Sequence, residues 1–120
     1  MNRIENSKIK RYRELIVGAF ERVITGDFLL MLFGSFSRGK ADRLSDIDVG
    51  VYAGRSLSPR EYFELKCALE ELPILRDVDL VDLAEVENPE FLEEVLRGKI
   101  WKSSPELLRD LKRRLRNLRK

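Results

Sequence analysis

Apolar residues recur every three or four positions in several segments of the chain, which is the spacing of one face of an α-helix. Between residues 4 and 24 charged positions separate them, so this segment is predicted to be an amphipathic helix. Three further helices are expected where a polar residue precedes proline, because the polar side chain caps backbone amides and proline lacks one. These helix starts are Ser58-Pro59, Asn88-Pro89 and Ser104-Pro105.

Shorter segments have the patterns of β-strands. Residues 28–33 form an uninterrupted apolar run, which predicts a buried strand. Residues 47–52 are rich in β-branched residues, residues 77–83 alternate between polar and apolar, and a short strand is expected near residues 100–101. Helices and strands thus alternate along most of the chain. This order favours a small α/β (α+β) domain with a mixed β-sheet flanked by helices.

The C-terminal segment differs in charge from the rest. We expect residues 1–104 to form the domain and residues 105–120 a basic amphipathic helix, with seven basic residues and one acidic residue from position 107 on. Its stripe of leucines needs a partner, either the core of this domain or another chain. Its basic face is either a solvated surface or a binding surface for RNA or an acidic protein.

The amino-acid composition limits the kinds of catalytic and metal site that this chain can have. The 120 residues contain no histidine and one cysteine, which excludes histidine-dependent catalytic triads, intramolecular disulfides and the commonest zinc sites. A metal would be held by oxygen atoms, as magnesium, manganese and calcium are. No apolar run approaches membrane-spanning length, and the N-terminus lacks a signal-peptide core. We therefore expect a cytoplasmic protein without membrane association.

Two aspartates interrupt the second predicted strand in the stretch "SDIDVGVY". Residues two apart in a strand point to the same face, so Asp46 and Asp48 are expected side by side. Two adjacent carboxylates repel each other unless a positive charge lies between them. The pair is therefore interpreted as ligands for a hard divalent cation.

Gly34 and Ser35 follow the first predicted strand, and ten residues separate Ser35 from Asp46. A short helical turn here would offer backbone N–H groups and the Ser35 hydroxyl to an anion, and glycine allows the backbone to approach closely. A phosphate on this turn and a metal on the neighbouring strand is the arrangement that a Mg-nucleotide requires. Arg38 and Lys40 are either phosphate or partner contacts or part of a solvated turn.

A third acidic segment, "DVDLVDL", supplies one more carboxylate. Asp77 and Asp79 share one face of this predicted strand and Asp82 lies on the other. If the strand lies beside the one carrying Asp46 and Asp48, then Asp79 joins them. Another register would bring Asp77 or Asp82 there instead. Three carboxylates around two metal ions could support an in-line phosphoryl displacement, with the third placed to accept a proton.

The stretch "GSFSRGKADRLSDIDVGV" resembles the signature of the polymerase-β-type nucleotidyltransferase superfamily. Within it, the chain is similar to the minimal nucleotidyltransferases (MNT proteins) that are paired with HEPN-domain toxins. "VDLVDL" resembles the strand of the third aspartate, which assigns that role to Asp79, and "FLEEVLRGKIW" resembles the helix and strand that follow. The matching signature positions are Gly34, Ser35, Arg38, Gly39, Ser45, Asp46 and Asp48.

The resemblance implies transfer of a nucleoside monophosphate from an NTP, expected to be ATP, to a hydroxyl. It implies two magnesium ions, with manganese as the alternative, at Asp46, Asp48 and Asp79, and triphosphate contacts from Gly34, Ser35 and Arg38. The implied acceptor is a tyrosine of a cognate HEPN ribonuclease toxin, which the protein would AMPylate as its antitoxin. Direct nucleic-acid binding is not expected.

Other functions remain open at this stage. One is a nucleotidyltransferase that acts on a small molecule or an RNA end. Another is a non-catalytic module of the same fold that binds a nucleotide or a partner. The clustered acids favour an enzyme, because binding alone does not require them. The short chain favours an acceptor carried by another protein, because there is little room for a domain that would hold a small one.

Overall fold

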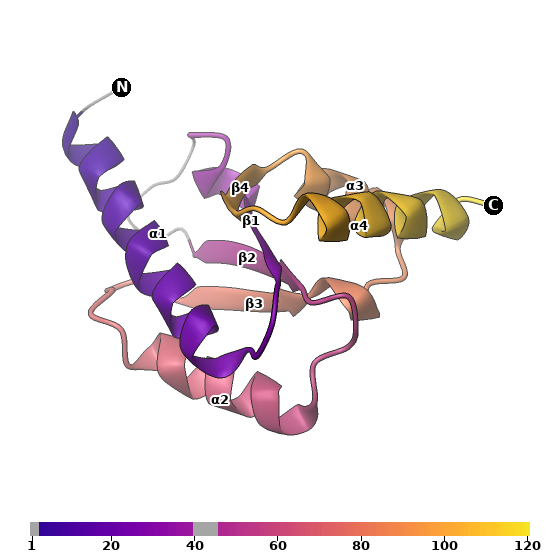
Figure 1. The fold of residues 1–120 in the computed structure, drawn as a ribbon. Helices are drawn as coiled ribbons and strands as arrows, with labels where there is room; N and C mark the ends of the chain where they lie inside the picture. Colours follow the sequence, from indigo (N-terminus) through magenta and orange to yellow (C-terminus); the bar gives the residue numbers. More distant parts are fainter. Residues whose placement is uncertain (1–2, 40–45) are drawn as a thin grey trace.

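A computed structural model describes residues 3–39 and 46–120, with side chains from residue 7 onward. A four-stranded sheet lies at the centre, with strand order β3-β2-β1-β4 (Figure 1). The pairs β1–β2 and β1–β4 are antiparallel and β2–β3 is parallel, so the sheet is mixed as predicted. The elements are α1 (Arg3–Val23), β1 (Leu29–Phe33), η1 (Gly34–Phe36), β2 (Ile47–Tyr52), α2 (Pro59–Glu70), β3 (Val78–Asp82), η2 (Leu83–Glu85), α3 (Pro89–Leu96), β4 (Lys99–Lys102) and α4 (Pro105–Leu118).

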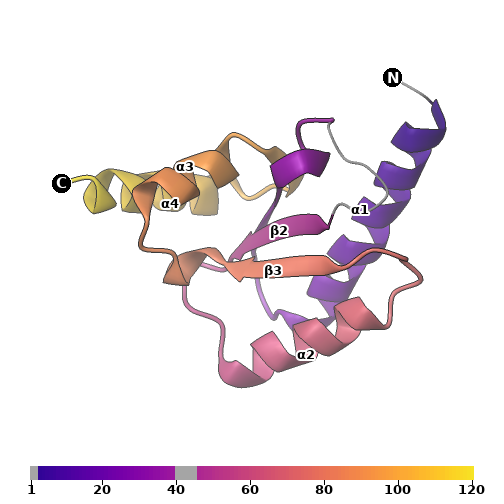
Figure 2. The same ribbon diagram turned by 180° about the vertical axis from the view of Figure 1, so that it is seen from behind.

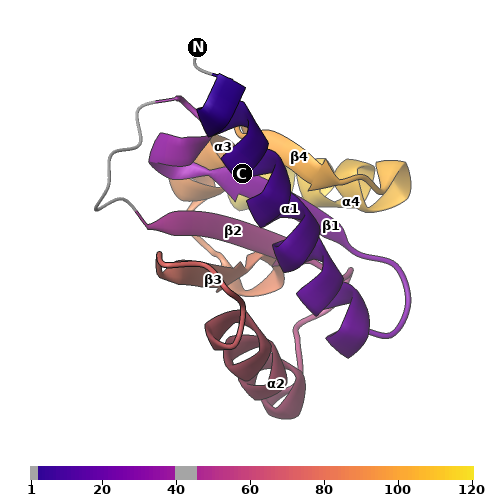
Figure 3. The ribbon, with the colours of Figure 1, turned by 90° about the vertical axis from the view of Figure 1, so that its left-hand side faces the viewer.

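Helices cover both faces of the sheet. One core cluster joins the sheet to α1 and α2, and the other joins it to α3 and α4 (Figures 1 and 3). Strand β1 is buried throughout because its alternate side chains enter the two clusters, Leu30 and Leu32 on one side and Leu29 and Met31 on the other. This explains the uninterrupted apolar run in its sequence.

The helix starts lie where the polar–proline pairs predict them. Ser58 and Glu61 form a reciprocal capping box: the Ser58 Oγ accepts from the Glu61 N–H at 3.1 Å, and Glu61 Oε1 accepts from the Ser58 N–H at 2.9 Å. Asn88 and Ser104 cap α3 and α4 through their side-chain oxygens. Strand β3 is one residue shorter at each end than expected. At its C-terminal end, Asp82 caps η2 and the chain turns there.

Helix α4 packs on the domain itself. Leu111 is fully buried in the cluster that also contains Leu92 and Val95 of α3. The Arg114 guanidinium donates to the Val86 carbonyl at 2.7 Å, and the Tyr52 hydroxyl donates to Asp110. The leucine stripe therefore has its partner in this domain's own core. Among the described helices, none is long and apolar enough to cross a membrane.

Candidate active site

The turn after β1 lies directly against the start of β2. Phe33 pairs with Asp48, so Gly34, the next residue, lies beside the Asp48 side chain. Gly34 has a φ of +74°, and a Cβ built there would overlap Asp48 Oδ2 and lie 3.2 Å from its Cγ. Only glycine fits this position without displacing the carboxylate. The Ser37 hydroxyl donates to the Gly34 carbonyl at 2.8 Å and closes the turn.

Asp48 and Asp79 face each other across neighbouring strands. They are register partners in the parallel β2–β3 pair, and their carboxyl groups are close enough to interact. The pKa of Asp48 is raised to about 6, first by burial, then by the charge and hydrogen bond of Asp79, and then by the charges of Asp46 and Glu94. Two carboxylates in contact are stable only with a proton or a cation between them, so the pair is suited to a cation.

The strand register selects Asp79 from the three candidate aspartates of the third acidic segment. Asp77 precedes β3, and its backbone carbonyl accepts from the Ile47 N–H at 2.9 Å. The Asp82 carboxylate accepts from the backbone N–H groups of Leu57 at 2.9 Å and Ala84 at 3.2 Å. Asp82 therefore fixes the chain around the ends of β3, and Asp79 is the one that joins Asp48.

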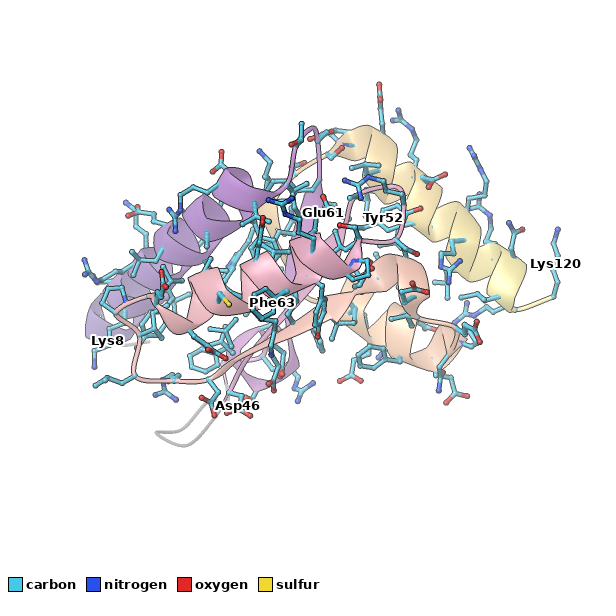
Figure 4. All side chains as sticks on the ribbon, turned by 90° about the horizontal axis from the view of Figure 1, so that it is seen from below. Lys8, Asp46, Tyr52, Glu61, Phe63 and Lys120 are labelled. Carbon is cyan, nitrogen blue, oxygen red and sulfur yellow. The ribbon has the colours of Figure 1, made fainter. Side chains whose placement is uncertain are left out.

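Asp46 lies one residue before β2 and is exposed (Figure 4). Its negative charge contributes to the raised pKa of Asp48. Within residues 3–39 and 46–120, however, no group of three or more acidic, histidine or cysteine side chains has the geometry of a formed metal site. The donor set still fits magnesium, because this ion is commonly held by one or two carboxylates and completes its shell with water and substrate phosphates.

The predicted phosphate contacts lie on the same turn. Ser35 is half-buried in η1, and its carbonyl accepts from the Arg38 N–H at 3.2 Å. The Arg38 guanidinium lies 3.2 Å from Glu94 of α3, in an ion pair that is about half exposed. Lys40 and Ser45 lie outside the described residues. Sequence reasoning missed Glu94, because an acid on an amphipathic helix has the pattern of an ordinary surface residue.

The family described as polymerase beta nucleotidyltransferase matches residues 28–106, about two thirds of the chain. The chain belongs to this family. The matched segment runs from the start of β1 into α4 and contains every predicted site residue. The resemblance of the "GSFSRGKADRLSDIDVGV" stretch to the family signature is thereby confirmed, as is the predicted fold class.

Three of the proteins that this chain resembles have a named activity or a solved structure. The protein adenylyltransferase MntA of Shewanella oneidensis is 39% identical over 74 residues, which cover 61% of this chain and 52% of that protein. The chain thus spans about half the length of this relative. A solved toxin–antitoxin complex with AMP-PNP is 28% identical, with a TM-score of 0.70 over 88% of this chain and 82% of that one. A chain from the solved complex of a tri-AMPylated Shewanella oneidensis HEPN toxin with an MNT antitoxin shares the fold at 23% identity, with a TM-score of 0.69 over 92% of this chain and 85% of that one.

Proposed function

We propose that this nucleotidyltransferase transfers AMP from ATP to a hydroxyl on a partner protein, a tyrosine of a cognate HEPN-type toxin, and so acts as its antitoxin. The observation that carries the proposal is the Asp48–Asp79 pair lying against the Gly34 turn. The 39% identical relative is a protein adenylyltransferase, and a 28% identical solved structure is a toxin–antitoxin complex with AMP-PNP. We place the reaction in the cytoplasm, the compartment that supplies ATP.

In the proposed reaction the tyrosine oxygen attacks the α-phosphorus of ATP. A new O–P bond forms, the bond from this phosphorus to the β-phosphate oxygen breaks, and pyrophosphate leaves. Asp79 is placed to accept the proton of the attacking hydroxyl. The turn carrying Gly34 and Ser35, together with Arg38, would hold the triphosphate through backbone N–H groups, a hydroxyl and a guanidinium.

Asp46, Asp48 and Asp79 would hold magnesium, two ions in the full complex, or manganese in its place. Bound metal would neutralise the triphosphate and the charge that develops in the transition state. Metal would also offset the cost of keeping Asp48 ionised where burial first, and the charge of Asp79 second, raise its pKa.

We also propose that α4 contributes to partner docking, in keeping with the expected boundary at residue 104 between the domain and a basic C-terminal helix. Its outward face carries exposed cations, whereas its leucines are used by the core. Point variants test this better than deletion, because removing α4 would uncover the second core cluster. Arg109→Glu with Arg116→Glu should weaken the complex with the toxin and leave ATP affinity unchanged, as measured by calorimetry.

The test of the proposed activity is incubation with ATP, magnesium and a HEPN-type protein, sought first in the neighbouring gene. Mass spectrometry should show added adenylyl groups, and the ribonuclease activity should fall. Asp46→Asn combined with Asp48→Asn should abolish the modification and keep the complex intact. If the double variant neutralises the toxin equally well and no adenylyl group is added, the protein acts by binding and the proposed activity is wrong.

A further inference from the structure

Strand β3 is an edge strand, and its outer edge is open to an added strand. In Figure 2 it is the outermost strand of the sheet, with α2 beneath it, and β2 is its one neighbour among the described strands. The Ile47 N–H donates to the Asp77 carbonyl, so in this parallel ladder the backbone groups of Asp77, Asp79 and Val81 face β2. Those of Val78 and Leu80 therefore point away from the sheet, in position to pair with another backbone.

A groove follows this edge between β3 and α2. Its wider part, about 620 Å³, lies between Leu57 and Tyr62 on one side and Leu80 and Val86 on the other. A second part, about 360 Å³, is lined by Lys66 of α2 and by Asp77, Val78 and Asp79. Residues 80–82 line the wider part and residues 77–79 line the second, so the groove runs along the edge and its narrower end contains Asp79.

The groove is bordered by exposed aromatic side chains. Tyr62 is 40% and Phe63 68% exposed, and both lie on α2. In Figure 4, Phe63 lies on the same side of α2 as Asp46, the aspartate that precedes β2. Large exposed apolar side chains beside an unpaired strand edge are typical of a surface that another chain covers.

The opposite edge of the sheet is protected differently. Strand β4 has the sequence KIWK, and its two lysines are the kind of residue that blocks pairing at a strand edge. Strand β3 has the sequence VDLVD and no lysine, and the Asp82 carboxylate is held by backbone N–H groups of its own chain. The difference leaves β3, the strand that carries Asp79, as the edge suited to pairing.

We propose that the β3 edge groove binds an extended segment of the acceptor protein as an added strand, with its hydroxyl-bearing residue at the Asp79 end. This proposal rests on the proposed function and specifies how its acceptor is held. Outward backbone groups of Val78 and Leu80 would pair with the segment, and the wide part of the groove would take its apolar side chains.

Charge favours a polypeptide as the occupant. Among the described residues, the groove lining has five carboxylates and two cations, which are Glu70, Asp77, Asp79, Asp82 and Glu85 against Lys66 and Arg76. This excess of carboxylates would repel a phosphodiester backbone and accept a neutral or basic peptide. Arg76 also stacks on Phe36 of η1, 4.9 Å from the ring centre, so this end of the groove adjoins the proposed triphosphate turn.

The test uses the full chain, MgATP and three blocked acceptors. The first is a peptide of alternating valine and threonine with one central tyrosine, the second is the same peptide with alternate backbone nitrogens methylated, and the third is N-acetyltyrosinamide. We expect kcat/KM for AMP transfer to be at least tenfold higher for the first acceptor than for the other two. Fluorescence anisotropy should show binding of the first peptide only.

Variants at the two edges of the sheet test whether the peptide binds at β3. Tyr62→Glu should reduce kcat/KM for the first peptide to that of N-acetyltyrosinamide and leave the Kd for MgATP unchanged. Ile100→Glu is the matched control, because Ile100 is a similarly exposed apolar residue (45%) on the opposite edge strand. It should change neither quantity.

The outcomes separate this proposal from the proposed function. Equal AMP transfer to all three acceptors would refute the groove and support the enzyme. Groove-dependent peptide binding without AMP transfer, together with a toxin that stays unmodified, would support the groove and refute the proposed activity. Absence of peptide binding, equal losses in Tyr62→Glu and Ile100→Glu, or a dimer of this chain that uses the β3 edge and excludes the peptide would each overturn the groove proposal.

Discussion

Gly34→Ala should damage the active site while the fold survives. The substitution has two separable costs. The first is the left-handed backbone conformation at φ +74°, which costs a residue with a Cβ about 1–2 kcal/mol. The second is the overlap of the new methyl group with Asp48 Oδ2, an overpacking term of about 1–3 kcal/mol. Together they predict a loss of about 2–5 kcal/mol in the free energy of unfolding.

Gly26→Ala is the matched control. Gly26 also has a positive φ, +94°, but a Cβ there would meet nothing within 4 Å. This variant should lose only the backbone term, about 1–2 kcal/mol. Urea denaturation of both variants, followed by calorimetric titration with MgATP, separates the terms. Gly34→Ala should lose at least tenfold in affinity, about 1.4 kcal/mol, and Gly26→Ala should lose none.

A double-mutant cycle tests the assignment to Asp48. In an Asp48→Ala background the carboxylate is gone, and only the Asp48 Cβ remains, at an ordinary 3.5 Å from the new methyl group. Gly34→Ala should then cost only its backbone term, with a coupling free energy of about 1 kcal/mol or more. If Gly34→Ala costs the same in both backgrounds and binds MgATP normally, the close approach does not exist and our view of the site is wrong.

Three further predictions concern the scaffold. The pKa of Glu61 is lowered to about 2, first by its hydrogen bond with Arg55. The contribution of Glu61 to stability is therefore complete above about pH 4.5 and is lost as the pH falls toward 2. Glu61→Gln should lower the free energy of unfolding at pH 7 but not near pH 2, as measured by urea denaturation at several pH values. Gly98→Ala places a methyl group on the Leu32 carbonyl oxygen, a backbone atom that cannot rotate away, and should cost about 1–3 kcal/mol by the same measurement. Leu111→Ala should cost about 2–5 kcal/mol; a loss below 1 kcal/mol would show that α4 is not part of the core.

Local sequence signals were sufficient for the elements. Strand β1 needed only its uninterrupted apolar run, and the helix starts at Ser58, Asn88 and Ser104 needed only capping side chains and proline. These features depend on residues within a few positions of each other, so they can be predicted from one sequence. The shortening of β3 at Leu83 was missed, because the Asp82 carboxylate at the end of the strand is also held by the N–H of Leu57, 25 positions away.

The site was predictable only in part, because its contacts are long-range. Without the family resemblance, choosing Asp79 over Asp77 or Asp82 requires the parallel register of β2 with β3, which no local pattern encodes. The Arg38–Glu94 pair joins residues 56 positions apart, from a turn and a helix that are predicted independently. The partner of the leucine stripe was left open for the same reason, since a stripe indicates that a surface is buried but not which surface covers it.

The pairing of the strands explains why the two ends of the signature, at Gly34 and Asp48, lie side by side. Because β1 and β2 are antiparallel neighbours, the residue after the end of β1 lies across from the start of β2, and Gly34 therefore meets Asp48. Parallel pairing of β3 with β2 then adds Asp79 at the same end. The β2–β3 strand pair thus positions both carboxylates through backbone hydrogen bonds, which hold them more precisely than a loop would.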